Sequence, residues 1–355
     1  MWPSWDLIPG GFHQESISSP AYLAQRLQKS QRRDPVKWCP NCQASTQTTG
    51  VTCPKDGAFL LEVDQAVVDD SLPQINTTVG NGYDLVAGPI KGGKSAVYKA
   101  HHKLFDRTVV MKILLPNLRG LADFVEKFNY EAKIISQVND ECIANIFDVG
   151  LLPGNAPFQV GEYCEGSSLD ALLRREEIEM AEIITAMSHV CDALNAAHKQ
   201  EYVHLAVKPN HIMVNFPNKN EVSVKLIDFY ESVRVGEHVH NTNDTPGLFR
   251  RCGFPSPELL QGKRVDARSD IYSLGCVLFK ALTGHAPFSA TDAKQLGMKH
   301  IQEKPKPLHQ VCTQKDFPAV LNNCVMTALE KDPERRFQNI LEMKRELQMI
   351  APSLL

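Results

Sequence analysis

Three cysteines near the N-terminus have the spacing of metal ligands. Cys39 and Cys42 are separated by Pro and Asn, and Cys53 follows after ten further residues, within the string Cys53-Pro-Lys-Asp56-Gly57. Thiolates at this spacing hold zinc, and Pro and Gly shape the tight turns that aim backbone amides at the sulfurs. Asp56 stands where a fourth cysteine would stand, and a carboxylate can also ligate zinc. We therefore predict a zinc site from Cys39, Cys42, Cys53 and Asp56, with a metal-free segment of ordinary reduced thiols as the alternative.

A glycine-rich turn is the second feature that could do chemistry. Gly88-Pro-Ile-Lys-Gly-Gly93-Lys94-Ser95 satisfies the G-x-x-x-x-G-K-[ST] pattern of P-loop NTPases. In that interpretation Lys94 holds the β- and γ-phosphates and Ser95 holds magnesium. A P-loop needs a helix directly after Ser95, whereas the next residues, Ala-Val-Tyr-Lys, are typical of a strand. A P-loop NTPase is therefore kept only as a distant alternative.

The elements that must position such sites change in kind along the chain. Short β-branched or aromatic runs separated by polar turns predict antiparallel strands. Apolar residues at three- and four-residue intervals predict helices, and a helix that is apolar on nearly every side is buried. The predicted strands are 83–86, 96–100, 108–114, 145–149 and 158–163; the predicted helices are 124–138, one along 183–197, and a buried one over 270–282 that stops at Gly284. We predict an α+β fold in which a strand-rich lobe precedes a helix-rich one.

Composition limits the classes of protein that fit. The 355 residues are 43% hydrophobic and 22% charged, which is typical of a globular chain long enough for a large core. The net charge of −3 gives no general attraction to nucleic acid or to an anionic membrane. No signal peptide is apparent, and no apolar run approaches the roughly 18 residues needed to span a bilayer. With ten irregularly spaced cysteines, we expect a reducing, cytoplasmic location.

The local strings and the order of lobes together resemble a known family. Residues 83–350 are similar to the eukaryotic-like Ser/Thr protein kinases of bacteria, which implies a two-lobed protein-kinase-like fold. The segment before it resembles a zinc ribbon. We accordingly predict a polar lead-in over 1–36, a zinc-ribbon-like module over 37–62, a linker over 63–82, and the kinase-like domain.

The resemblance implies a set of nucleotide-site residues. Lys112, in Val109-Val-Met-Lys112, is similar to the lysine that holds the α- and β-phosphates, and Glu131 to the glutamate that holds this lysine. Asp228 resembles the aspartate that binds magnesium, so ATP with magnesium is the implied cofactor. The residues implied for nucleotide binding are Gly92, Gly93, Val97, Val110, Lys112, Glu131, Glu162, Cys164, Met213 and Asp228. Gly161 stands at the gatekeeper position, where it removes bulk from the back of the pocket.

Of the positions that depart from the family pattern, four bear most directly on catalysis. In the string His204-Leu-Ala-Val-Lys208-Pro-Asn-His211, Ala206 replaces the catalytic aspartate and His211 replaces the magnesium-binding asparagine. Tyr230 replaces the glycine of D-F-G, and Arg251 replaces a substrate-facing threonine. The supporting residues implied by the family are kept: Asp270, and the pair Glu258 and Arg336.

These departures predict a pseudokinase. Loss of a general base typically lowers the rate about 10²–10⁴-fold, so we expect a protein that binds ATP and acts on an unknown protein partner as a scaffold or regulator. The alternative is a slow or atypical Ser/Thr protein kinase that transfers the γ-phosphate of ATP to a protein hydroxyl with Lys208 and Asp228 as its remaining catalytic residues.

Overall fold

The computed structural model describes residues 72–218, 221–237, 239 and 244–350, and the backbone of three short strands nearer the N-terminus. These strands, β1 (Lys37–Trp38), β2 (Ser45–Thr46) and β3 (Leu61–Glu62), pair antiparallel in the order β2-β1-β3. Cys39, Cys42, Cys53 and Asp56 lie outside the described residues. The zinc site and the polar lead-in therefore stay predictions.

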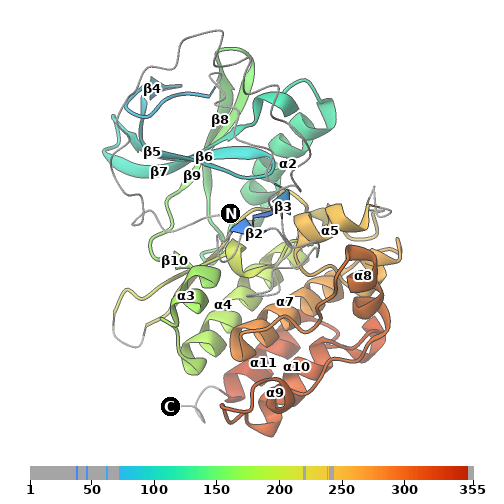
Figure 1. Cartoon of the computed structure of the whole chain (residues 1–355). Coiled ribbons are helices and arrows are strands. Elements are labelled where there is room, and N and C mark those ends of the chain that lie inside the picture. The colour runs from blue at the N-terminus through green and yellow to red at the C-terminus, as the bar shows by residue number, and fades with distance from the viewer. Residues whose placement is uncertain are drawn as a thin grey trace.

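A six-stranded antiparallel sheet forms the first lobe (Figure 1). Its order is β4-β5-β6-β7-β9-β8, and its strands are β4 (Thr78–Val79), β5 (Tyr83–Lys91), β6 (Ser95–His102), β7 (Arg107–Leu114), β8 (Ile146–Leu152) and β9 (Ala156–Glu162). One apolar cluster, which includes Leu85, Tyr98 and Met111, forms the core of the sheet. All five predicted strands are confirmed, with ends displaced by a few residues.

The sheet extends into the segment that the sequence assigned to the linker. Strand β4 pairs with β5, and Leu72 is buried in the core of the sheet. The Tyr98 hydroxyl donates a hydrogen bond to the Pro73 carbonyl at 2.8 Å. Residues from 72 onward therefore pack as part of the first lobe.

The turn between β5 and β6 decides against one alternative. Ser95 is the first residue of strand β6 and pairs with Leu114 of β7, so a strand follows the Gly-Gly-Lys-Ser string. A P-loop requires a helix there, because the helix N-terminus binds the phosphates. The P-loop interpretation is wrong.

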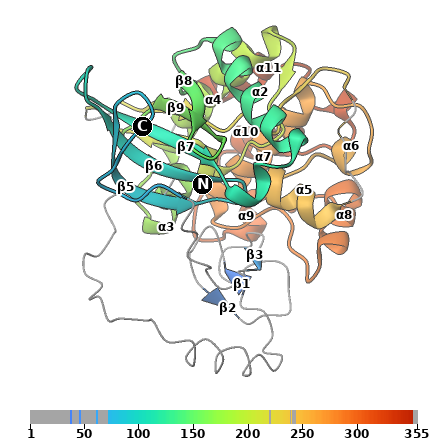
Figure 2. The same ribbon diagram turned by 90° about the horizontal axis from the view of Figure 1, so that it is seen from above.

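Helix α2 (Ala122–Val138) crosses beside the sheet after the short 3₁₀ turn η1 (Pro116–Leu118), as Figure 2 shows from above. Its buried positions include Phe128, Glu131 and Ile135, so one face of the helix carries both apolar residues and a carboxylate. The apolar residues confirm the predicted helix over 124–138. The buried Glu131 needs a charged partner, and this partner lies in the site described below.

The second lobe is mainly helical. Its helices are α3 (Leu169–Arg175), α4 (Met180–Lys199), α5 (Thr245–Cys252), α6 (Pro257–Leu260), α7 (Ala267–Thr283), α8 (Ala293–Gln302), α9 (Leu308–Val311), α10 (Ala319–Ala328) and α11 (Ile340–Ile350), with the 3₁₀ turn η3 (Pro333–Arg335). Helix α7 is buried from Ser269 to Thr283 and ends at Gly284, whose φ of 78° is left-handed. At Gly275 a Cβ would lie 2.8 Å from the Ala328 Cβ, so only glycine lets α10 approach this closely. The predicted buried helix is confirmed.

Short strands at the junction of the lobes carry the candidate site. They are β10 (Ser167–Ser168), β11 (Tyr202–Val203), β12 (Ile212–Asn215), β13 (Ser223–Leu226) and β14 (Val233–Arg234), with the 3₁₀ turn η2 (Pro209–His211). Strand β12 pairs with both β10 and β13, and β11 pairs with β14. These two small sheets hold the loop after β11 beside the loop after β13.

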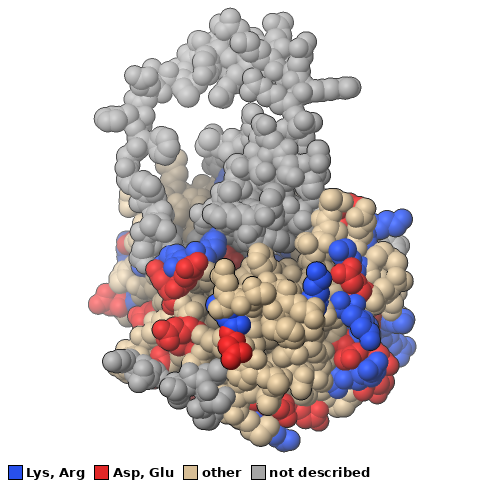
Figure 3. All heavy atoms as spheres, turned by 60° about the horizontal axis from the view of Figure 1, so that its bottom comes forward, with Lys and Arg blue, Asp and Glu red and all other residues tan. Residues whose placement is uncertain are grey.

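Among the described residues, no helix combines the length and apolar character that crossing a bilayer requires. On the face shown in Figure 3, acidic and basic side chains lie intermixed.

Candidate functional site

A half-buried lysine and two carboxylates form the centre of the site. The Lys112 ammonium on β7 donates to both Glu131 carboxylate oxygens, at 3.0 and 2.8 Å, and lies 3.3 Å from Oδ1 of Asp228. The Glu131 side chain is only 3% exposed. The predicted pair of Lys112 and Glu131 is thus present, and the structure adds Asp228 to it.

Asp228 is held in place by its backbone and by its neighbours. Its φ of 66° is left-handed, which is uncommon for a residue other than glycine. The next residue, Phe229, is fully buried, with its ring centroid 4.5 Å from that of His204. The Ile227 amide donates to the His211 carbonyl at 3.0 Å, which ties the loop after β13 to turn η2. These contacts point the Asp228 carboxylate at Lys112.

The Asp270 carboxylate of helix α7 holds the loop after β11 in place by hydrogen bonds. This carboxylate accepts hydrogen bonds from the backbone amides of His204 and Leu205, both at 2.8 Å. Leu205 has a left-handed φ of 59°, so these bonds support an unfavourable backbone conformation. The supporting role expected for Asp270 is confirmed.

Glu258 and Arg336 form the second expected support. The Arg336 guanidinium makes two bonds of 2.8 Å to the two Glu258 oxygens, and both residues are buried. A two-bond pair of this kind is strong and geometrically specific. It fixes helix α6, and with it the end of the segment after Asp228, to the chain that follows η3.

Ala206 and His211 are buried residues in the segment between β11 and β12. Ala206 is 1% exposed, its amide donates to Nδ1 of His204 at 3.2 Å, and its carbonyl lies 3.0 Å from Nδ1 of His211. The other ring nitrogen of His211, Nε2, lies 3.1 Å from Oδ2 of Asp228. His211 therefore bridges the Ala206 backbone and the Asp228 carboxylate.

Lys208 turns toward helix α5. Its ammonium donates to the Arg251 carbonyl at 3.0 Å and lies 3.5 Å from the Arg250 carbonyl. The Arg251 side chain in turn lies 3.4 Å from a Glu231 carboxylate oxygen. Lys208, a predicted catalytic residue, and Arg251, at the predicted substrate-facing position, are thus brought together through the backbone of α5.

The glycine-rich turn reaches the second lobe by a contact that sequence spacing did not predict. The Lys94 ammonium pairs with Glu231 and lies 3.8 Å from the centroid of the Tyr230 ring. Gly92 closes the turn by donating its amide to the Ser95 carbonyl at 2.8 Å. Lys94 and Glu231 are 137 residues apart, and no local pattern indicates such a pairing.

Several of the residues predicted to contact adenine are buried apolar residues from both lobes. Cys164, Met213 and Ile227 form one buried cluster, and Val97 and Val110 are buried on strands β6 and β7. Glu162 is anchored by the Lys225 ammonium at 2.9 Å. The structure gives Gly161 a further reason to be glycine, because a Cβ there would lie 2.9 Å from the Asn145 carbonyl oxygen.

Burial and neighbouring charges shift the pKa values at the centre. Burial alone would lower the pKa of Lys112, but the Asp228 and Glu131 carboxylates outweigh it and raise the pKa above its usual value. Burial likewise opposes the charge on Asp228, yet Lys112 and then His211 hold its pKa well below the usual range. Burial, with the nearby Lys208 charge, holds the pKa of His211 well below its usual range. At neutral pH the imidazole is neutral and lies beside a charged carboxylate.

Comparison with known proteins now identifies the family. Residues 91–346 match the protein kinase domain family. The chain belongs to the protein kinase family. It is 36% identical over 275 residues to a probable serine/threonine-protein kinase of Clostridium acetobutylicum, across 77% of this chain and 40% of that protein. It is 32% identical over 260 residues to the serine/threonine-protein kinase PknB of Mycobacterium tuberculosis, across 72% of this chain and 41% of that protein.

These matches cover only part of each relative. The chain spans about two fifths of the length of these relatives. The crystal structure of the M. tuberculosis PknI kinase domain matches with a TM-score of 0.60 and 20% identity, covering 79% of this chain and all of that one. This likeness confirms the two-lobed kinase fold. Membership of the family implies ATP with magnesium as the nucleotide complex.

The metal-binding positions do not fit magnesium fully. Magnesium prefers oxygen ligands in octahedral geometry, whereas His211 offers a ring nitrogen where the family has an asparagine oxygen. Asp228 fits, since its carboxylate lies at the centre of the site. Among the described residues, no group of three or more His, Cys, Asp or Glu side chains is arranged to hold a metal ion. A metal here would need ligands from the nucleotide or from water.

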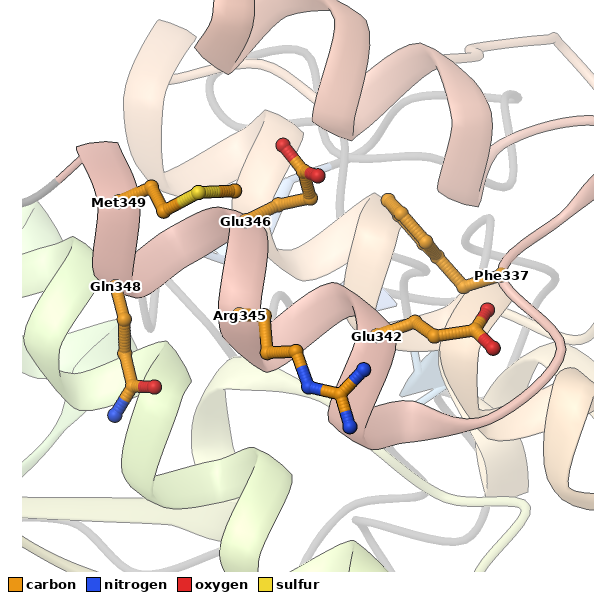
Figure 4. A pocket seen from close by; sticks show the side chains of 6 residues that line it. All are labelled: Phe337, Glu342, Arg345, Glu346, Gln348 and Met349. Atoms are coloured by element: carbon orange, nitrogen blue, oxygen red, sulfur yellow. The ribbon is translucent and has the colours of Figure 1, made fainter.

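A separate pocket lies at the far end of the second lobe (Figure 4). Its lining consists of Phe337 and one face of α11: Glu342, Arg345, Glu346, Gln348 and Met349. Glu342 already accepts hydrogen bonds from the Gln338 amide and the Asn339 side chain, both at 2.8 Å. The junction of the lobes is the better candidate site, because it combines buried charges with the family's nucleotide-binding positions.

Proposed function

We propose that this protein is a nucleotide-binding pseudokinase that acts by binding a protein partner. The observation that carries the proposal is Ala206, which stands where the resemblance places the catalytic aspartate and whose methyl group cannot accept a proton. The presence of Arg251, where the family has a substrate-facing threonine, supports the same conclusion. The partner is unknown, and scaffolding or regulation is the role that remains when phosphotransfer is lost.

Retention of the central charges supports nucleotide binding. The Lys112 ammonium contacts both the buried Glu131 carboxylate and the half-buried Asp228 carboxylate. Burying charged groups costs free energy that their mutual attraction repays only in good geometry. Together they carry two negative charges and one positive charge, and a phosphate chain with its counter-ion would complete this arrangement.

Each residue then has a binding role. Lys112 would hold the α- and β-phosphates, while Glu131 keeps the lysine in place through its two hydrogen bonds. Backbone groups of Glu162 and Cys164 would hold the adenine edge above Met213 and beneath Val97 and Val110. Asp228 would hold the metal that accompanies the nucleotide and supplies countercharge to its phosphates.

Thermal unfolding with nucleotide tests this function. A ligand present at about a hundred times its dissociation constant stabilises the folded state by about 2.7 kcal/mol, so ADP or ATP should raise the melting temperature measurably. Lys112→Met should abolish the rise. Lys133→Met, which makes the same change at an exposed position on α2, should keep it. Unchanged melting of the unmodified chain with millimolar nucleotide and either Mg²⁺ or Mn²⁺ would contradict nucleotide binding.

Slow phosphotransfer is the second candidate function. The retained Lys208 and Asp228 favour it, because phosphoryl transfer depends largely on positioning and charge. Its substrate would be a Ser or Thr hydroxyl of a protein. Transfer of labelled γ-phosphate separates this candidate from the pseudokinase.

We propose further that Cys39, Cys42 and Cys53, with Asp56, bind zinc. Metal analysis should find about one zinc per chain, and Cys42→Ser should remove it, since a structural site depends on its full ligand set. Protein purified without chelators and containing no zinc would favour the metal-free alternative.

A further inference from the structure

Glu231 is a buried carboxylate on which three basic side chains converge. Its Oε1 accepts from the Lys94 ammonium, while Oε2 lies 3.4 Å from Nε of Arg251 and 4.0 Å from the Lys127 ammonium. Lys94 lies on the turn between β5 and β6, Lys127 on α2 and Arg251 on α5. The Glu231 carboxylate therefore joins two elements of the first lobe to one of the second.

The Lys94–Glu231 pair combines a buried anion with a cation that still reaches solvent. Burial alone would raise the pKa of Glu231, but the charges of Lys94 and Lys127 outweigh it and hold the pKa below its usual value. The Glu231 side chain is 9% exposed and the Lys94 side chain 25%. Because Lys94 remains in contact with solvent, its ammonium can exchange this carboxylate for another anion.

The pair lies beside the proposed phosphate-binding residues. Lys94 directly precedes β6, whose register with β7 places it near the end of β7 that follows Lys112. Glu231 follows Asp228 by three residues in the chain. Burial lowers the pKa of Lys208, and the charges of Asp228 and of the Lys94–Glu231 pair are close enough to influence it as well. The pair therefore connects the two lobes in the same neighbourhood as Asp228.

A phosphate chain and the Glu231 carboxylate are rival partners for Lys94. An ammonium on a flexible stem binds phosphate as a point charge. A phosphate group near an intact Lys94–Glu231 pair also faces the carboxylate charge, and like charges repel more strongly in a half-buried place than in water. Both effects grow as phosphates are added to the nucleotide. They are smallest for a nucleotide whose chain ends before Lys94.

We propose that Glu231 is a specificity-determining residue of the nucleotide site, whose carboxylate competes with the terminal phosphate of ATP for Lys94 and so weakens the binding of longer phosphate chains. The inference rests on the proposed nucleotide binding, in which Lys112 holds the α- and β-phosphates and the terminal phosphate is left for Lys94. This role needs no P-loop, because strand β6 follows Lys94.

Calorimetric titration with AMP, ADP and ATP in excess Mg²⁺ tests the competition. Glu231→Gln keeps the size of the side chain and removes its charge. It should tighten ATP binding at least tenfold, tighten ADP binding less, and change AMP binding by less than about threefold. Glu237→Gln makes the same change at an exposed position of the same segment and should leave all three affinities unchanged.

A second variant shows whether the effect passes through the ion pair. In the Lys94→Gln background, Glu231→Gln should change ATP affinity less than threefold, because the cation that the carboxylate holds is gone. Far-UV circular dichroism checks that each variant is folded. Glu231→Ala removes the same charge and replaces Glu231→Gln if that variant fails the check.

The outcomes separate the inference from the function on which it rests. Equal gains for AMP, ADP and ATP would overturn it, because Glu231 would then act on the whole site and not on the terminal phosphate. Unchanged affinities in Glu231→Gln, or a full ATP gain in the Lys94→Gln background, would overturn it while leaving nucleotide binding intact. No binding of any nucleotide by the unmodified chain and its variants would overturn both.

Discussion

At the scale of single residues, Tyr230 changes what the segment after Asp228 can do. Its ring packs with Leu114 and Phe128, and its hydroxyl donates to the Phe124 carbonyl at 3.3 Å. The family has glycine here, which leaves this space open and the backbone free. Tyr230 therefore fixes helix α2, with its Glu131, next to the strand that carries Lys112.

We expect Tyr230→Gly to lower the free energy of unfolding by about 3–5 kcal/mol, as large-to-small substitutions of buried aromatic residues do. Tyr230→Phe removes only the bond to the Phe124 carbonyl and should lose about 0.5–1.5 kcal/mol. Urea unfolding measures both. Equal losses in the two variants would show that the ring does not hold α2.

At the scale of elements, one ion pair joins parts distant in sequence. Glu258 on α6 and Arg336 after η3 are both buried, and the Arg268 carbonyl at the start of α7 also accepts from Arg336 at 2.9 Å. The pair holds α6, the start of α7 and the chain after η3 together. Its retention beside an altered reaction centre is what a binding protein with a kinase fold requires.

Arg336→Met should destabilise the protein by about 3–5 kcal/mol, because it leaves the Glu258 carboxylate buried without its partner. Arg335→Met is the matched control: its side chain is 65% exposed, and its pair with Glu330 at 3.4 Å should contribute less than about 1 kcal/mol. Chemical denaturation gives both values. A loss at Arg336 no larger than that at Arg335 would contradict the supporting role.

The sequence predicted the elements better than the contacts between them. The strands and helices followed from local periodicity, and Lys112 with Glu131 followed from resemblance to the family. The orientation of His211 toward Asp228 depends on the pairing of β12 with β13, and the pairing of Lys94 with Glu231 depends on how the two lobes pack. Such contacts between distant residues leave no trace in local spacing, so a single sequence does not predict them.

At the scale of the whole molecule, a buried histidine makes stability depend on pH. His300 on α8 lies among the rings of Phe249, Tyr272 and Phe288, and the Tyr272 hydroxyl lies 3.0 Å from its Nδ1. Burial, with the Lys331 charge, lowers the pKa of His300 to about 3. In the unfolded chain His300 takes up a proton near pH 6.5. In the folded protein it takes up a proton only near its lowered pKa.

The unfolded state thus binds more protons between these pKa values, and the free energy of unfolding should fall as the pH is lowered through that window. The contribution of His300 is on the order of a few kcal/mol. His300→Gln should make the pH profile of stability flatter, whereas His309→Gln, at an exposed site, should leave it unchanged. An unaltered profile in His300→Gln would contradict this assignment.

Nucleotide binding between the lobes and absence of phosphotransfer together define the proposed pseudokinase. The direct measurement is transfer of label from [γ-³²P]ATP to generic Ser/Thr protein substrates, with Mg²⁺ or Mn²⁺. We predict no labelling above that of Lys112→Met, and no normal turnover in Ala206→Asp, because His211 and Tyr230 still alter the site. Robust, metal-dependent labelling by the unmodified chain that Lys112→Met abolishes would contradict the pseudokinase.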